Sequence, residues 1–313
     1  MPEVVIVIPD LYLPPVAYDA PVALPALDRV ATFGQRLILE HGWRAWLARW
    51  VGREDLSKLP TSVVAAESPH ELTSWMATPI HLAAGLTTLH FDARGILRLT
   101  PQEQQTLARD FPDSAMQLVP LESGEFLLLQ PQFGAVTTTE PARIVGGQVA
   151  EALPKGGGAA QLRRLGAEIE MWLHEHPVNR ERASRNQLTI STLWIWGGGA
   201  GSPAARAIDT LPRAFGSDSY LHGLWRFCGG AAQPLPEQLD SCTFAEGAVV
   251  VVEAGRMSLT ELDRRFVAPT VEALQRGEIA RVSILANDRC LAMSAGAHRK
   301  FWRRSRNALE SLR

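Results

Sequence analysis

Three runs of mainly apolar residues mark buried strands near the two ends of the chain. Two of them, residues 4–8 (VVIVI) and 248–252 (AVVVV), are unbroken. The third, residues 281–285 (RVSIL), begins with Arg281 and contains Ser283. An unbroken, β-branched run is typical of a parallel strand covered on both faces, whereas a half-exposed strand alternates apolar and polar positions. Helical patterns separate these strands, so the sequence predicts a parallel sheet with right-handed crossovers.

The helical patterns carry their own start and stop signals. Residues 25–33 (PALDRVATF) place apolar positions on one face and are followed by Gly34, a common helix terminator. Residues 258–275 begin at Ser258, and Glu261 follows at the spacing of a capping box. Both segments are therefore expected to be helices that pack on the sheet.

A stripe of large side chains indicates a further helix over residues 41–51. Four residues recur at the spacing i, i+3, i+4 and i+7: Trp43, Trp46, Leu47 and Trp50. This spacing places them on one helix face, where packing against the core is the favoured interpretation and an aromatic ligand box is the alternative.

The middle of the chain differs, because its apolar runs are short and suit antiparallel connections. These runs lie at residues 86–91, 116–119 and 126–129, with helices expected from the TPQE capping pattern at residues 100–103 and over residues 162–174. A strand at residues 188–196 then resumes the parallel-sheet pattern. We therefore expect an α/β core domain of residues 1–78 and 178–313, and a smaller inserted α+β domain of residues 79–177.

The composition argues against several classes of protein and of binding site. The formal net charge is −2 over 313 residues, which argues against a general nucleic-acid or membrane binder. The three cysteines (Cys228, Cys242 and Cys290) form no CxxC pair, which argues against a disulfide framework or a zinc site. No basic leader and no apolar stretch of membrane-spanning length occurs, so a cytoplasmic protein without a membrane span is expected.

Two other clusters have structural explanations. The glycines of GGGAGSP (residues 197–203) lack the Lys-Ser/Thr of a P-loop, and a tight turn after a strand is preferred over a phosphate cradle. Basic residues between 299 and 306 surround Phe301 and Trp302. A solvated helix face is the favoured interpretation of this cluster, and contact with nucleic acid or acidic lipid is the alternative.

Three segments, in chain order, resemble the archaeal-type cofactor-independent phosphoglycerate mutases of the alkaline phosphatase superfamily. They are VVIVIPD with ALPALDRVATFG, PIHLAAGLTTLHFDARGILRLTPQEQQTLARDF, and HPVNRERASRNQLTISTLWIWGGGAG. The resemblance implies an alkaline-phosphatase-like core with helices on both faces of its sheet, plus an inserted cap domain. The segment SLTELDRRFVAPTVEALQRGEIARVSILANDRCLAM is similar to the bacterial RpfE-type regulatory proteins, which implies a regulatory context.

The superfamily reaction uses two divalent metal ions, such as Mn or Zn, held by several His and Asp residues. Under the resemblance, Asp10, Asp288 and His298 would hold metal here, but Arg289 stands where the family has a histidine. An arginine has no lone pair for a cation. No nucleophile stands out among the hydroxyl residues that precede the cap, namely Ser62, Ser68, Thr73, Ser74 and Thr78.

The resemblance also assigns substrate-side positions to Asn179, Arg180 and Arg182, which would meet an anion; structural salt bridges are the alternative. We therefore expect a catalytically degenerate, phosphoglycerate-mutase-like protein, without a resident cofactor, that binds a small anionic ligand or a protein partner. The alternative is a metal-dependent phosphomutase or phosphohydrolase with an altered Mn or Zn ligand set.

Overall fold

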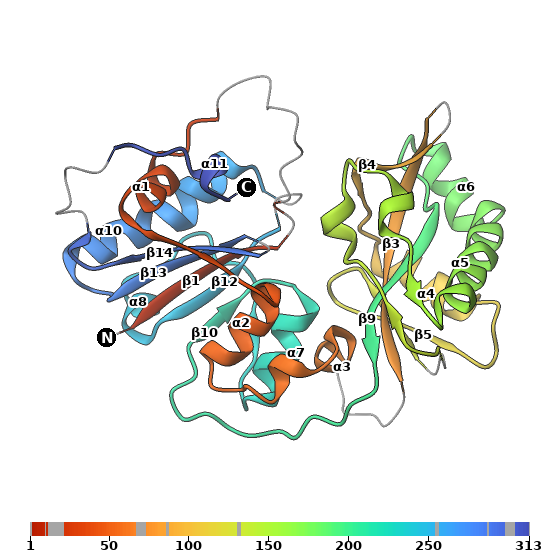
Figure 1. Cartoon of the computed structure of the whole chain (residues 1–313), viewed down its shortest axis with the longest axis horizontal. Helices are drawn as coiled ribbons and strands as arrows, with labels where there is room; N and C mark the ends of the chain where they lie inside the picture. The colour runs from red at the N-terminus through yellow and green to blue at the C-terminus, as the bar shows by residue number, and fades with distance from the viewer. Residues whose placement is uncertain are drawn as a thin grey trace. The chain divides into compact units, whose positions relative to one another are not determined.

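The computed structural model describes residues 2–9, 11, 22–66, 73–85, 88–129, 133–253, 257–286, 288–297 and 304–312. The chain forms two compact units, Met1–Lys58 with Ala205–Arg313, and Leu59–Ala204 (Figure 1). The expected domain boundaries after residues 78 and 177 both lie inside the second unit, the first of them within a strand and the second at the start of a helix.

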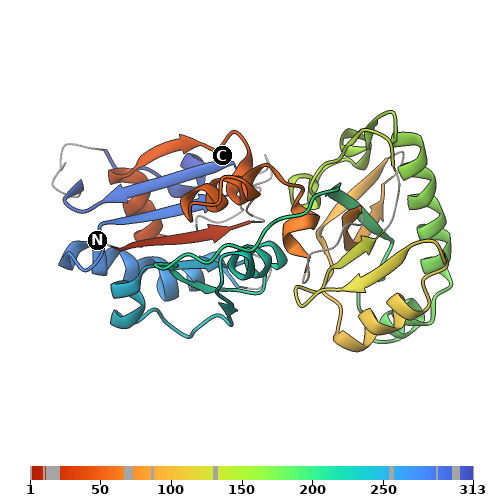
Figure 2. The same cartoon turned by 90° about the horizontal axis from the view of Figure 1, so that it is seen from below.

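The first unit contains a seven-stranded sheet of order β11-β10-β12-β1-β13-β14-β2. The strands are β1 (Glu3–Ile8), β2 (Gln35–Ile38), β10 (Arg213–Phe215), β11 (Ala232–Gln233), β12 (Ala248–Val251), β13 (Arg281–Ala286) and β14 (Arg289–Ser294). Five neighbouring strands run parallel, namely β11, β10, β12, β1 and β13. Strand β14 is antiparallel to both of its neighbours, β13 and β2. Figure 2 shows β1, β13, β14 and β2 side by side in this order. The mixed α/β class with a largely parallel sheet is thus confirmed.

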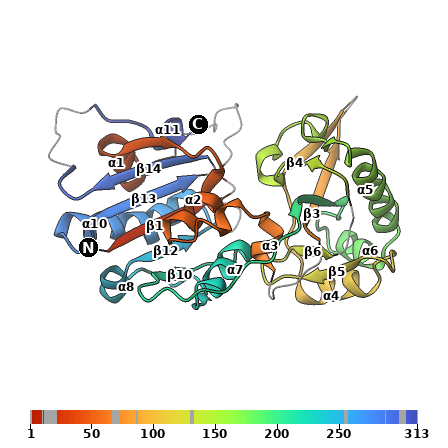
Figure 3. The ribbon, with the colours of Figure 1, turned by 60° about the horizontal axis from the view of Figure 1, so that its bottom comes forward.

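Helices cover both faces of this sheet. They are α1 (Pro25–Phe33), α2 (Gly42–Trp50), α7 (Ser219–Phe227), α8 (Ser241–Glu246), α9 (Leu259–Leu262), α10 (Ala268–Arg276) and α11 (Ala308–Leu312), with a 3-10 turn η1 (Leu56–Lys58). Figures 1 and 3 show α1, α10 and α11 on one face, and α2 and α7 on the other. Residues 4–8 of the central strand are completely buried, as their unbroken apolar run predicted.

The second unit contains a five-stranded sheet in which β4, β3, β6 and β5 follow one another and β9 also pairs with β3. Its strands are β3 (Ser74–Ala84), β4 (Leu89–Ile96), β5 (Gln117–Pro120), β6 (Phe126–Leu129) and β9 (Thr192–Gly199), and a separate ribbon joins β7 (Val136–Thr137) to β8 (Lys155–Gly156). Its helices are α3 (Thr61–Ala65), α4 (Pro101–Arg109), α5 (Ala159–His174) and α6 (Pro177–Ser184), with short turns η2 (Pro141–Ile144) and η3 (Val149–Ala152). Helices α4, α5 and α6 pack on one sheet face around a shared apolar cluster.

Strand β9 differs from its sequence expectation. It pairs antiparallel with β3 in the second unit, rather than with the parallel strands of the first. The three glycines, expected in a turn after the strand, belong to the strand itself. A Cβ at Gly198 would lie 1.9 Å from the indole of Trp75, so glycine is required where β9 crosses this ring.

The helix expected over residues 258–275 forms in three parts, because a π-helical turn, η4 (Asp263–Val267), separates α9 from α10. Ser258 caps it as expected, by accepting a hydrogen bond from the Glu261 N–H at 3.2 Å. The turn also presents Asp263, whose carboxylate accepts hydrogen bonds from the N–H groups of Ala26 (3.1 Å) and Leu27 (2.7 Å). A side chain 236 residues away in sequence therefore caps the first turn of α1.

We expect Asp263→Ala to destabilise the first unit by about 1–3 kcal/mol, because two buried N–H groups lose their acceptor. Asp263→Asn retains one acceptor oxygen and is expected to lose less. Urea denaturation measures the difference, and hydrogen exchange at the Ala26 and Leu27 amides locates it. Unchanged exchange at these amides in the alanine variant would show that α1 does not depend on this cap.

Candidate functional site

The carboxyl edge of the parallel sheet is the expected position for a ligand site. In the sheet register, Ile8 pairs with Ala286 and Val7 pairs with Val251. Asp288 follows β13 by two residues, and Glu253 follows β12 by two. The predicted metal ligands Asp10 and His298 lie outside the described residues.

Asp288 forms an ion pair with its neighbour. Its Oδ2 lies 3.2 Å from a guanidinium nitrogen of Arg289, the first residue of β14. Its backbone carbonyl accepts a hydrogen bond from the Leu39 N–H at 2.7 Å, which fixes the turn between β13 and β14 against the chain after β2. The arginine that replaces the expected histidine thus places positive charge beside this carboxylate, where a divalent cation would be repelled.

A second acidic residue, Asp218, lies just beyond β10. This buried carboxylate caps α7 by accepting from the Leu221 N–H at 2.9 Å, and Arg44 lies 3.9 Å from it. A ring nitrogen of His222 lies 2.9 Å from the carbonyl oxygen of Gly216. Asp218 is a functional-site candidate that the sequence motifs do not reveal, although an aspartate three residues before a helical N–H is a capping signal.

Three other acidic side chains of this unit also have structural partners. Glu261 pairs with Arg265 at 3.0 Å, and Asp240 caps α8 through the Thr243 N–H at 2.8 Å. Asp263 caps α1, and its burial raises the pKa of the carboxyl group despite the two N–H groups that favour the anion. Within the described ranges, no three or more His, Cys, Asp or Glu residues gather as a possible metal site. The acidic residues named here are therefore held by helix caps and ion pairs within the fold.

Three of the five hydroxyl residues that precede the cap, Ser62, Ser74 and Thr78, make hydrogen bonds within the second unit. Ser62 donates to the Ser74 carbonyl at 2.8 Å, and the Ser74 hydroxyl donates to Ser62 at 3.1 Å. Thr78 donates to Glu125 and accepts from the Trp196 indole N–H at 2.8 Å. All three side chains are buried, and Ser68 lies outside the described residues. Their hydrogen bonds hold β3 against α3 and β9.

The predicted anion-binding residues lie on α6. Asn179 is buried and bridges the carbonyls of Leu173 and Ile190, at 2.8 Å each. Arg182 is also buried, and its guanidinium donates to the Leu188 carbonyl at 2.8 Å and to Glu103 at 2.9 Å. Arg180 is exposed. Asn179 and Arg182 thus hold α6 against neighbouring segments, and anion binding by the three residues stays a prediction.

His176, the N-cap of α6, is a buried titratable group. Its Nδ1 accepts from the Val178 N–H at 3.3 Å, while its Nε2 lies 3.6 Å from Asp110 without a hydrogen bond. Burial lowers the pKa of this imidazole, and Arg109 and Arg180 add to the effect, while Asp110 opposes it. The neutral ring is therefore the form that this site favours.

Comparison with known proteins finds one short sequence likeness. No protein-family model matches the chain. A segment of 64 residues, 20% of the chain, is 34% identical to a Geobacter sulfurreducens protein described as a probable 2,3-bisphosphoglycerate-independent phosphoglycerate mutase. The aligned segment spans 16% of that protein.

Two solved structures resemble the chain over most of its length. A cofactor-independent phosphoglycerate mutase from Thermoplasma acidophilum is 14% identical, with 95% of this chain and 90% of that one covered and a TM-score of 0.39. A protein from Pyrococcus horikoshii is 12% identical, with 98% and 91% covered and a TM-score of 0.46. The similarity in sequence to a phosphoglycerate mutase is thus confined to one segment of 64 residues.

The lowered pKa of His176 predicts a pH-dependent stability. The unfolded chain binds a proton below the ordinary histidine pKa of about 6.5, whereas the folded site resists protonation until a lower pH. Stability should therefore fall as the pH decreases from 7.5 to 5.5. Asn in place of His176 can cap α6 without titrating, so His176→Asn should lose less stability over this range. Urea midpoints that fall equally in both proteins would contradict this assignment.

Proposed function

We propose that this chain is a phosphoglycerate-mutase-like protein that has lost catalysis and acts as a ligand-binding or regulatory protein. The observation that supports it most is the ion pair between Asp288 and Arg289 at the carboxyl edge of the sheet. A guanidinium in this position disfavours a divalent cation and favours an anion instead. A scaffold of this kind would bind an anionic ligand directly, without a resident Mn or Zn ion.

The ligand that we propose is a small anion, such as a phosphorylated metabolite. Arg289 retains partial exposure at the strand edge, with 22% of its side-chain surface accessible. In the second unit, Arg180 presents an exposed guanidinium next to Asn179 on α6. Both could make charge-assisted hydrogen bonds to carboxylate or phosphate oxygens. A protein partner that carries an acidic group would satisfy the same chemistry.

The proposed setting is the cytoplasm, and the proposed role is regulatory, in keeping with the resemblance of the C-terminal segment to RpfE-type proteins. No described helix has both the length and the apolar character that crossing a membrane requires. The near-neutral charge also gives no support to a nucleic-acid partner.

A metal-dependent phosphomutase or phosphohydrolase is the second candidate, and the sheet register favours it. Ile8 and Ala286 are paired, and Asp10 and Asp288 each follow these residues by two positions in the sequence. Carboxylates that directly follow two adjacent parallel strands lie at the sheet edge where ligands bind, so both could coordinate one metal ion. This candidate needs Asp10, Asp288 and His298 as its ligands, with Arg289 turned away from the metal.

The first candidate predicts that Arg289 contributes to anion affinity. In calorimetric titrations with 3-phosphoglycerate and with inorganic phosphate, Arg289→Gln should weaken binding by about 10- to 100-fold, the loss of one charge-assisted hydrogen bond. Arg281→Gln is the matched control, because Arg281 is exposed at the opposite end of β13. Equal affinities in the parent and both variants, or no binding of either anion to the parent, would argue against an anion site at this edge.

A further inference from the structure

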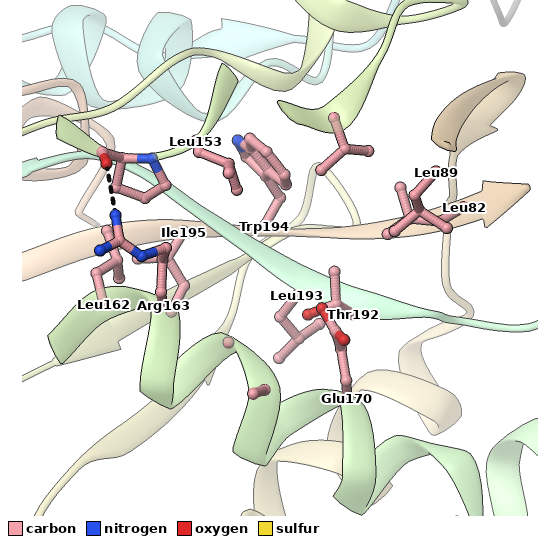
Figure 4. Close-up of a pocket in the computed structure, with 14 residues that line it drawn as sticks. Leu82, Leu89, Leu153, Leu162, Arg163, Glu170, Thr192, Leu193, Trp194 and Ile195 are labelled. Atoms are coloured by element: carbon pink, nitrogen blue, oxygen red, sulfur yellow. Dashed lines mark hydrogen bonds between the residues drawn. The ribbon is translucent and has the colours of Figure 1, made fainter. Parts of the chain in front are cut away.

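A pocket in the second unit lies outside the sheet edge described above. It has a volume of about 250 Å³ and is formed by α5, β9 and the chain around β3, β4 and η3 (Figure 4). All but three of the residues that line it are apolar, and the exceptions are Arg163, Glu170 and Thr192. The volume lies between the ~150 Å³ of a cavity that accepts benzene and the ~300 Å³ at which drug-sized sites begin. The pocket is therefore suited to a ligand with one small apolar body.

One buried polar atom inside the pocket has no partner. Thr192 is 4% exposed, and its hydroxyl oxygen makes no hydrogen bond with any described residue. An unsatisfied buried hydroxyl costs about 1–3 kcal/mol and is rare in native proteins. A ligand with a hydrogen-bonding group at this point would satisfy it.

The charge beside this hydroxyl is negative. Glu170 lines the same pocket, and Figure 4 shows Glu170 and Thr192 between Arg163 on one side and Leu82 and Leu89 on the other. Among the described residues, Glu170 has neither an ion pair nor a hydrogen bond. Although much of this residue is exposed, partial burial raises the pKa of its carboxyl group. No nearby positive group offsets this effect by stabilising the carboxylate.

The guanidinium group of Arg163, the positive group of the pocket, is bound to the backbone of the pocket lining. A guanidinium nitrogen of Arg163 donates to the carbonyl oxygen of Pro154 at 3.2 Å, the contact drawn in Figure 4. Arg163 therefore helps to hold the segment after η3 against α5. The unsatisfied groups that remain are an acceptor carboxylate and a hydroxyl, which together match a donor that carries positive charge.

We propose that this pocket binds a small organic cation, namely a primary ammonium group on an aromatic or branched aliphatic body. The ammonium would donate to the Glu170 carboxylate and to the Thr192 hydroxyl. The apolar body would lie against Trp194 of β9, which is on the same side of the strand as Thr192, and against Leu82 of β3. This site is independent of the proposed anion-binding residues, since neither Arg289 nor Asn179, Arg180 or Arg182 lines the pocket.

A glycine on α5 allows the pocket to be filled by mutation. Gly166 lines the pocket in the middle of the helix, and a Cβ built on it would meet no atom within 4 Å. Gly166→Leu should therefore place its side chain in the pocket without displacing backbone. Gly166→Ala is the matched control, because both changes improve helix propensity by roughly the same amount, up to about 1 kcal/mol, but alanine leaves most of the pocket open.

The test uses three isosteric probes in calorimetric titrations: 2-phenylethylammonium, 2-phenylethanol and phenylacetate. We expect the ammonium to bind at least tenfold more tightly than the alcohol and the carboxylate. Glu170→Gln should weaken the ammonium by about tenfold, the effect of losing a close charge partner, and leave the alcohol unchanged. Gly166→Leu should abolish binding, whereas Gly166→Ala and Arg289→Gln should retain it.

Several outcomes would overturn the proposal. They are the absence of ammonium binding to the parent protein, equal affinities for the three probes, and binding that persists in Gly166→Leu. Circular dichroism confirms that each variant is folded. The Glu170 side chain makes no hydrogen bond or ion pair with a described residue, and Gln has nearly the same shape, so Glu170→Gln removes the charge with little change in packing.

Discussion

The buried carboxylate of Asp263 joins the two ends of the first unit. It accepts two hydrogen bonds from the first turn of α1, across 236 residues of sequence, while β1 is completed on either side by the late strands β12 and β13. The N-terminal strand and helix therefore depend on contacts that the C-terminal part supplies. In this position each carboxylate oxygen accepts one hydrogen bond from a peptide N–H group, so the side chain serves as a helix cap.

The same principle extends to the other acidic residues around the sheet. Asp218 and Asp240 cap helices, Glu261 pairs with Arg265, and Asp288 faces Arg289. Each contact stabilises local structure by satisfying an orphan N–H group or by neutralising a charge. A two-metal centre needs carboxylates that converge without such partners. The described carboxylates named here are instead held by helix N–H groups and by arginines.

Local signals predicted local structure well. The continuous apolar run at residues 4–8 identified a strand buried on both faces, and the Thr100–Glu103 capping box forms with both of its hydrogen bonds. The strand at residues 188–196 was assigned to the wrong sheet, because an apolar run does not state whether its partners are parallel. Strand β3 was missed since Pro79, which cannot donate to a ladder, interrupts its pattern. The replacement at Arg289 could be found from sequence, whereas the cap formed by Asp263 depends on tertiary contacts that no local pattern encodes.

Turnover with added metal ions distinguishes a binding scaffold that has lost catalysis, as proposed here, from an active metal-dependent enzyme. The measurement is hydrolysis of p-nitrophenyl phosphate and conversion of 3-phosphoglycerate with Mn²⁺, Mg²⁺, Co²⁺ or Zn²⁺ added, for the parent protein and for Asp10→Ala. The account predicts no metal-dependent rate above that of the variant. A rate that rises with added metal and disappears in Asp10→Ala would contradict it.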